Sequence, residues 1–227
     1  MITAPLLIEE IGNMDIDKFI QLRTHLFHLT DAENLPSIIE SRVISSSAIL
    51  AAKAEVPNIE AFLRTRRVGH HEISNGKFKA KLRDQDPLFR NIVIKNLEGG
   101  WTFEDFVFSL NSRVFFWATE KDLKNHYKRY ENQNEFPKII RVRTAELFSI
   151  NSHEPGFCHL NSGAPRCSSY YAEGAPPRGP KTFQKAEDYS RPPSSVREVT
   201  FLNSVKLPAD IWVSNHPDSP YRLSKFD

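Results

Sequence analysis

The sequence predicts an α+β fold in a single domain that spans residues 1–227. Short apolar segments with the period of a strand are mixed with helical segments, but the two kinds do not alternate strictly and no glycine-rich turns join them. No internal repeat with a period of roughly 20 to 50 residues is visible, which excludes solenoids and propellers. With 227 residues, of which 40% are hydrophobic, the chain is long enough to bury one sizeable core.

The first part of the chain combines short strands with capped helices. Asn34 is suited to be the N-cap of a helix, and Pro36 falls in its first turn, where the missing N–H does no harm. The predicted elements are a strand over residues 25–29, helices over 34–41, 45–53 and 58–66, and one or two short strands over 70–83.

The second part of the chain follows the same mixed pattern. Thr102 precedes an apolar segment with acids in its first turn, as a helix start prefers. The predicted elements are helices over residues 103–110 and 121–130, and strands over 113–117, 138–142, 196–204 and 211–214.

A long loop is predicted at about residues 163–193. Six of the 15 prolines fall there among Gly, Ser, Tyr and Arg, and no apolar period supports an element. Loops of this length inside a compact domain are usually functional or disordered. We therefore expect this one to be a lid or a substrate loop.

The charge of the chain is unevenly distributed. The overall net charge is only +2, yet residues 61–90 carry eight Lys or Arg against three acids, with His70 and His71 beside them. Such a stretch is either a solvated face or a track for a polyanion such as nucleic acid or the phosphates of a dinucleotide.

Neither a membrane span nor an export signal is expected. Apolar stretches such as residues 114–118 are far shorter than the roughly 20 residues of a membrane helix, and the N-terminus carries acids where a signal peptide carries Lys or Arg. The two cysteines, Cys158 and Cys167, are too few for a disulfide scaffold. A cytoplasmic location is the expectation.

Common cofactor motifs are absent from the sequence. It contains no GxGxxG after a strand, no GxxxxGK[ST], no HExxH and no GxSxG. His153, Cys158, His159 and Cys167 lie close together, but their spacing fits no standard zinc pattern. We therefore expect no metal site.

The segment Phe27-His-Leu-Thr30, followed by Asn34-Leu-Pro-Ser-Ile-Ile39, resembles the first strand and helix of the DarT-type DNA ADP-ribosyltransferases. These toxins and phage-defence proteins move ADP-ribose from NAD⁺ onto a nucleobase. The similarity covers most of residues 25–204 and continues in the same order through residues 64–67, 113–118, 138–142, 158–163 and 196–201. Residues 83–88 and 110–113 depart from the family pattern, which indicates a related branch.

The resemblance implies a fold, an activity and partners. The fold would be an ADP-ribosyltransferase-like split sheet, mixed or antiparallel, with flanking helices. The activity would be NAD-dependent mono-ADP-ribosyl transfer to a base of single-stranded DNA or RNA, in a toxin or defence effector. NAD would be the co-substrate, and a macrodomain hydrolase encoded nearby could be the antitoxin.

The resemblance also implies roles for individual residues. Glu198 would be the catalytic glutamate and general base. An arginine, with Arg67 preferred over Arg64, Arg66 and Arg83, would clamp the pyrophosphate or steady developing charge. The residues implied in NAD binding are His28, Thr30, Asn34, Phe116 and Trp117. Arg166, Tyr170, Tyr171 and Arg178, in the long loop, could stack bases and hold phosphates.

Each assignment has an alternative. His28, flanked by Phe27 and Leu29, could be a satisfied histidine in an apolar strand, and Glu198 the outward-facing acid of an amphipathic strand. The acceptor could also be a protein or a small molecule, or the domain could be a catalytically silent module that binds nucleotide or nucleic acid.

Overall fold

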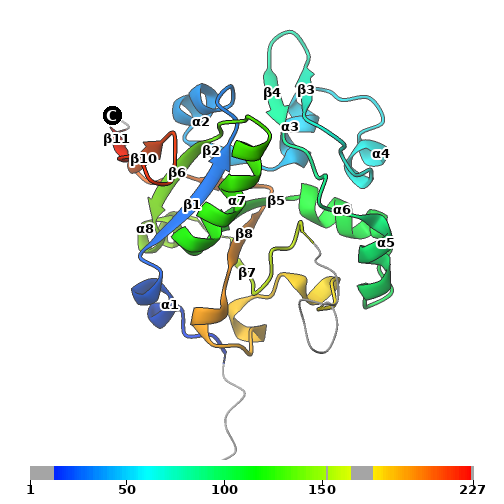
Figure 1. Ribbon diagram of the computed structural model, residues 1–227. Helices are drawn as coiled ribbons and strands as arrows, with labels where there is room; N and C mark the ends of the chain where they lie inside the picture. Colours follow the sequence, from blue (N-terminus) through cyan, green and yellow to red (C-terminus); the bar gives the residue numbers. More distant parts are fainter. Residues whose placement is uncertain (1–12, 152, 165–175, 226–227) are drawn as a thin grey trace, which may run out of the picture.

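The computed structural model describes residues 13–151, 153–164 and 176–225, and these form a mixed α+β fold around an antiparallel sheet (Figure 1). The helices are α1 (Ile16–Leu22), α2 (Leu35–Ser41), α3 (Ser47–Lys53), α4 (Ile59–Arg64), α5 (Arg90–Val93), α6 (Phe103–Asn111), α7 (Glu120–Asn132) and α8 (Thr144–Ile150). The strands are β1 (His25–Thr30), β2 (Val43–Ser45), β3 (His71–Ser74), β4 (Lys79–Leu82), β5 (Arg113–Trp117), β6 (Lys138–Arg143), β7 (Gly156–Cys158), β8 (Glu198–Leu202), β9 (Ser204–Lys206), β10 (Asp210–Ser214) and β11 (Arg222–Lys225).

The central sheet has seven strands in the order β11-β10-β6-β1-β5-β8-β7, and all neighbours are antiparallel. β1 pairs with β6 along all six of its residues. In the described chain its pairing with β5 is limited to Phe27 opposite Trp117. The sheet therefore separates between β1 and β5 beyond this pair, toward Thr30 and the start of β5.

Helices cover both faces of the sheet. On one face, Leu123 and Tyr127 of α7 pack against Phe27, Trp117 and Ile139. On the other face the largest core cluster joins the sheet to α1, α2 and α8, with Phe19, Ile38 and Leu147 as their buried side chains. Figure 1 shows α7 crossing in front of the sheet.

A smaller unit contains α3, α4 and the β3–β4 hairpin, which projects from the sheet in Figure 1. It has its own apolar cluster, in which Leu63, Ile73 and Leu82 are buried. The Asn34 side chain ties this unit to α2, because its amide nitrogen donates to the carbonyl of Lys81 at 2.8 Å and its oxygen accepts from the Lys81 N–H at 2.9 Å.

The predicted loop at residues 163–193 is only partly irregular. The described portion holds three short 3₁₀ helices, Pro180–Thr182, Ala186–Asp188 and Pro193–Ser195. Tyr189 is fully buried in the main core, and Gln184 forms a bridge with Phe157. The expectation of a lid is therefore wrong for residues 176–193, which are packed against the domain.

The predicted elements are largely confirmed, but the helices α1, α5 and α8 were not predicted. α7 is longer at both ends than predicted, and the strand predicted over residues 196–204 divides into β8 and β9. β2, β7 and β11 were not predicted because strands of three or four residues carry too few alternating positions to be recognised. No helix in the described part of the chain is long and apolar enough to cross a membrane.

Candidate functional site

The separation of β1 from β5 is marked by a buried polar contact. The Nδ1 of His28 lies 2.8 Å from the carbonyl oxygen of Phe115 across the gap between the strands. Its ring also contacts Phe116, with 5.5 Å between ring centroids. The imidazole thus replaces the backbone hydrogen bonds that β1 and β5 do not form at this level.

The protonation state of His28 follows from this environment. Burial, opposed by the hydrogen bond to Phe115 and assisted by the positive charge of Arg83, lowers the pKa of His28 to about 4. The ring is therefore neutral at pH 7. Because a carbonyl only accepts, Nδ1 carries the proton, and Nε2 is left as a hydrogen-bond acceptor with no partner among the described residues.

Arg83 is the arginine that the structure places near His28. Its guanidinium lies 4.2 Å from the ring centroid of Tyr130 on α7, and it forms ion pairs with Glu135 at 3.2 Å and Asp31 at 3.7 Å. Within the described residues its Nε is buried without a hydrogen-bond partner. This N–H is therefore an unsatisfied buried donor.

An aromatic wall extends from Arg83 to the sheet. The ring of His126 lies 5.1 Å from Tyr130 and 4.9 Å from Trp117, and its Nε2 is 3.2 Å from the Tyr130 hydroxyl. Burial lowers the pKa of His126 to about 4, with the charges of Arg129 and Arg83 acting in the same direction. The His126 ring in this wall is therefore uncharged at pH 7.

Glu198 begins β8 directly beside this wall. It is the cross-strand partner of Trp117, which in turn pairs with Phe27, so the three residues form one row over β8, β5 and β1. Cys158 of β7 lies on the other side of Glu198. The sequence pattern correctly placed Glu198 on a late strand, and the structure shows that this strand pairs with β5.

The Glu198 carboxylate is enclosed. The residue is 4% exposed, and it accepts hydrogen bonds from the Ser162 hydroxyl at 2.7 Å and from the Ser162 N–H at 3.2 Å. Burial raises the pKa of Glu198 to about 7, although the bonds from Ser162 and the charges of Arg197 and Arg178 oppose this shift. Glu198 is thus not the outward-facing acid of an amphipathic strand.

His28 and Glu198 are separated by β5, and their side chains leave the sheet on opposite faces. Side chains alternate along a strand, so His28 lies with Phe116, whereas Glu198 lies with Phe27 and Trp117. The two groups are therefore on different sides of the sheet, and the Glu198 carboxylate is bonded to Ser162.

Arg67 lies apart from this arrangement, and the structure does not favour the catalytic role predicted for it. Its guanidinium is buried and donates to Asn111 at 2.6 Å, to the Arg83 carbonyl at 3.1 Å and to the Ser47 hydroxyl at 3.3 Å. Burial lowers its pKa to about 10. All three guanidinium nitrogens have protein partners, so Arg67 joins α3, β4 and α6 instead of clamping a ligand.

The other residues predicted to bind NAD are in or near the sheet but differ in availability. Asn34 uses both atoms of its amide on Lys81. Phe116 is fully buried in the main core against Phe201. Thr30 is buried at the end of β1 opposite Lys138. Of the five, His28 keeps a ring nitrogen without a partner among the described residues, and Trp117 lies in the row with Phe27 and Glu198.

The residues predicted to bind nucleic acid are not confirmed. Arg166, Tyr170 and Tyr171 lie outside the described residues. Arg178 is 2% exposed, and its guanidinium donates to the carbonyls of Ser162, Asn161 and Pro176, each at 3.3 Å. It is a buried support for the turn that carries Ser162, so its assignment to a nucleic-acid surface is corrected.

Sequence reasoning missed Ser162 and underused Arg83. Ser162 lies in the segment 158–163 that resembles the DarT family, but a serine in a turn carries no signal of its own. Arg83 was one of several arginines in the basic stretch, and only the tertiary structure selects it.

The predicted absence of a metal site stays a prediction. Within the described residues no group of three or more His, Cys, Asp or Glu is arranged to hold an ion. Burial raises the pKa of the Cys158 thiol well above its usual range, so this sulfur is a poor ligand at pH 7. Cys167 lies outside the described residues.

A family model described as a family of unknown function, DUF7002, matches residues 24–211. The match starts just before β1 and ends within β10, so it contains both His28 and Glu198. No curated protein and no solved structure matches the chain.

Proposed function

The chain belongs to the DUF7002 family, whose function is unknown, and from the geometry of its site we propose that it is an NAD-dependent mono-ADP-ribosyltransferase. The acceptor that we propose is a nucleobase of single-stranded DNA or RNA. The observation that carries the proposal is the row formed by Phe27, Trp117 and Glu198 at the point where β1 and β5 separate. It places a carboxyl group with a pKa of about 7 next to an aromatic wall.

The chemistry of the transfer explains why these groups suit it. When the bond from C1′ of the ribose to nicotinamide breaks, positive charge develops on the sugar, and a nearby carboxylate stabilises it. Nicotinamide leaves as a neutral molecule with the electron pair of that bond. A nitrogen of the base forms the new bond to C1′, and its proton passes to Glu198, whose pKa is close to the working pH.

The remaining groups would bind and orient NAD. The Nε2 of His28 is an acceptor with a fixed tautomer and suits a ribose hydroxyl. The buried Nε of Arg83 is a donor and suits a phosphate oxygen. Trp117 offers a flat apolar surface to nicotinamide.

Labelled NAD⁺ tests this proposal. The protein is incubated with adenylate-labelled NAD⁺ and single-stranded DNA, single-stranded RNA or protein, and both label transfer and nicotinamide release are measured. Glu198→Gln should lower transfer at least a hundredfold and leave NAD⁺ binding intact, because only the charge and the proton acceptor change. The matched control is Glu187→Gln, which removes the same charge at an exposed position on the 3₁₀ helix Ala186–Asp188.

The outcome that rejects the proposal is a preparation that binds NAD⁺ but labels no nucleic acid. Label in protein instead of oligonucleotide would keep the transferase and change the acceptor. If nucleic acid is the acceptor, mass spectrometry of the oligonucleotide identifies the base. A toxic transferase of this kind would call for an antitoxin, and a macrodomain hydrolase is the partner that we propose for it.

The enclosure of Glu198 favours a second candidate. A carboxyl that is 4% exposed and bonded to Ser162 also suits a silent module in which Glu198 only holds the turn at residues 161–163. In that case Glu198→Gln would change neither ligand binding nor NAD⁺ consumption, which would be zero in both proteins.

A further inference from the structure

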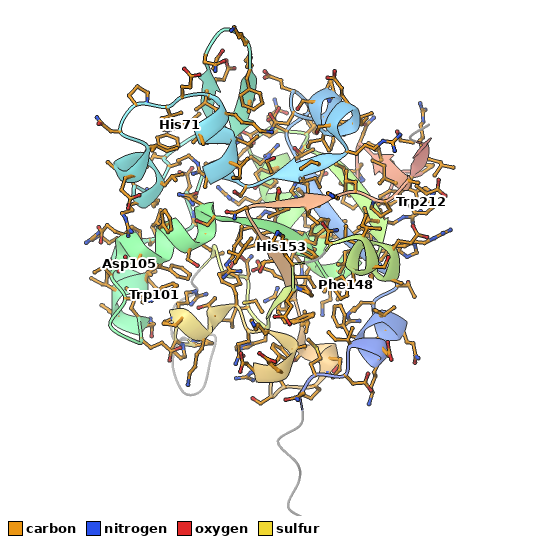
Figure 2. The ribbon with its side chains drawn as sticks, turned by 180° about the vertical axis from the view of Figure 1, so that it is seen from behind. His71, Trp101, Asp105, Phe148, His153 and Trp212 are labelled. Atoms are coloured by element: carbon orange, nitrogen blue, oxygen red, sulfur yellow. The ribbon has the colours of Figure 1, made fainter. Side chains whose placement is uncertain are left out.

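A second polar and aromatic surface lies on the half of the sheet away from Glu198. It consists of His25 of β1, Arg141 and Arg143 of β6, Trp212 of β10 and Tyr221, just before β11, and we call it the arginine–tryptophan face. Figure 2 shows Trp212 at the edge of the molecule, on the side opposite Trp101 and Asp105. None of these five residues entered the predicted site.

Although they lie on different strands, the register of the strands places the arginine–tryptophan face and Glu198 on the same face of the sheet. Arg141 pairs with Phe27 of β1 and with Trp212 of β10, and Phe27 continues through Trp117 to Glu198. One cross-strand row thus connects the arginine–tryptophan face with the proposed base. At about 4.8 Å per strand, Arg141 and Glu198 are roughly 14 Å apart along the sheet.

The arginines of this face are stacked on aromatic rings. The guanidinium of Arg141 lies 4.3 Å from the ring centroid of Tyr221 and 5.2 Å from that of Trp212. The guanidinium of Arg143 is also 5.2 Å from Trp212, and His25 meets the same ring edge-on. Stacking fixes the planes of both guanidinium groups. The N–H edge of Arg141 is left to recognise an anion, whereas Arg143 already uses one nitrogen on Glu146.

Two polar atoms of this face have no protein partner. The Nε of Arg141 and the hydroxyl of Tyr221 are both buried, and neither has a hydrogen-bond partner within the described residues. A buried donor that is left unpaired destabilises the fold. Arg141 lies over the ring of Tyr221, so both unpaired atoms belong to one stacked pair. We take this as an indication that an acceptor from outside the chain completes the site.

The charges around the face favour an anion on the side of Arg141. Arg143 is paired with Glu146 at 2.7 Å, and Glu120, Asp210 and Asp218 are the other acids nearby. Arg141 has no ion pair among the described residues. Arg141 and Arg143 are two positions apart on β6, roughly 7 Å, a distance comparable with that between successive phosphates of an extended strand.

We propose that the arginine–tryptophan face binds single-stranded nucleic acid, with phosphates on Arg141 and Arg143 and a base on the ring of Trp212 or Tyr221. Stacked aromatic rings combined with cations are the usual means of holding an unpaired strand. That this strand is the acceptor of the transfer rests on the proposed function, whereas the binding itself does not.

Fluorescence anisotropy of labelled oligonucleotides tests the proposal without NAD⁺. Single-stranded DNA and single-stranded RNA are titrated with the wild type and with Arg143→Gln, Arg141→Gln and Arg222→Gln. Arg143 is exposed, so its substitution carries little risk for folding. Arg222 is the matched control, because it is an exposed arginine that pairs with Val213 and so lies on the other face of the sheet.

Arg143→Gln should weaken binding about fivefold and Arg141→Gln about tenfold, and each should reduce the slope of log Kd against log salt by roughly 0.7. Arg222→Gln should bind as the wild type does. The proposal is overturned if all three variants bind alike, or if the wild type binds anionic vesicles but neither oligonucleotide. Binding that depends on Arg141 and Arg143 without any transfer of label would reject the proposed function alone.

Discussion

The hydroxyl of Ser162 donates a 2.7 Å hydrogen bond to the buried carboxylate of Glu198. This contact joins the turn after β7 to the first residue of β8. The guanidinium of Arg178 supports the same turn by donating to the carbonyl groups of Ser162 and Asn161. It stabilises the charged form of a carboxyl that burial otherwise keeps neutral. The behaviour of Glu198 with pH therefore depends on Ser162.

The stability of the protein should depend on the ionisation of Glu198. The pKa of this group is about 7 in the folded protein, whereas its ordinary value, which applies to the unfolded chain, is 4.5. Between these two pH values the folded state therefore holds a proton that the unfolded state has lost. Stability should fall as pH rises through this window and then stay level above about pH 7, with a total loss of about 3 kcal/mol.

Urea unfolding of the wild type and Glu198→Gln at about pH 5 and about pH 8 measures this effect, because glutamine does not titrate. The variant should gain stability relative to the wild type at the higher pH. A difference between the two proteins that is the same at both pH values would contradict the prediction.

Removing the Ser162 hydroxyl should raise the pKa of Glu198 further. Ser162→Ala deletes a hydrogen bond to a charged group, worth about 1.5–3 kcal/mol, which corresponds to about one to two pH units. The rise of activity with pH, expected around pH 7 in the wild type, should move upward by that amount. The control is Ser149→Ala, because Ser149 is an exposed serine of α8 that bonds only the carbonyl of Glu146 among the described residues. If the dependence of activity on pH is unchanged in both variants, Glu198 is not the base.

The two nitrogens of His28 should have separable roles. His28→Asn can keep a donor near the position of Nδ1 and its bond to Phe115, but it lacks the acceptor at Nε2. We expect its affinity for NAD⁺ to fall about tenfold, equivalent to about 1.4 kcal/mol, with little change in unfolding. His28→Ala should lose both stability and affinity. Calorimetric titration and thermal melts check this pair, and unchanged affinity in His28→Asn would exclude Nε2 from the site.

Arg67 should matter for stability and not for catalysis. Arg67→Ala leaves the Arg83 carbonyl without its side-chain donor and the Asn111 oxygen with only the amide of Gln85, and we expect a loss of about 3 kcal/mol. Arg64→Ala, which removes partly exposed ion pairs with Glu60 and Asp105 and the stacking on Phe108, should cost clearly less stability. Denaturant unfolding gives both values; a folded Arg67→Ala protein that bound NAD⁺ much more weakly would restore the original assignment.

Local patterns predicted much of the fold. The strand predicted over residues 113–117 has the same bounds as β5, and Thr102 precedes and caps α6 as expected. These features depend on neighbouring residues, through side-chain alternation and capping. Asn34 precedes α2 as predicted, but its side chain makes no cap and serves the β3–β4 hairpin instead. A single sequence contains no signal for that long-range use.

The candidate site divides in the same way. The sequence by itself determined the mixture of short strands and helices, the position of Glu198 on a late strand and that of His28 on an early one, because period and composition act over a few residues. Only the tertiary structure decided that Trp117 pairs with Glu198, that Ser162 encloses its carboxylate, and that Arg83 approaches His28 while Arg67 is used internally. Those relationships join segments far apart in the chain, and they arise from strand register and burial, which no local pattern encodes.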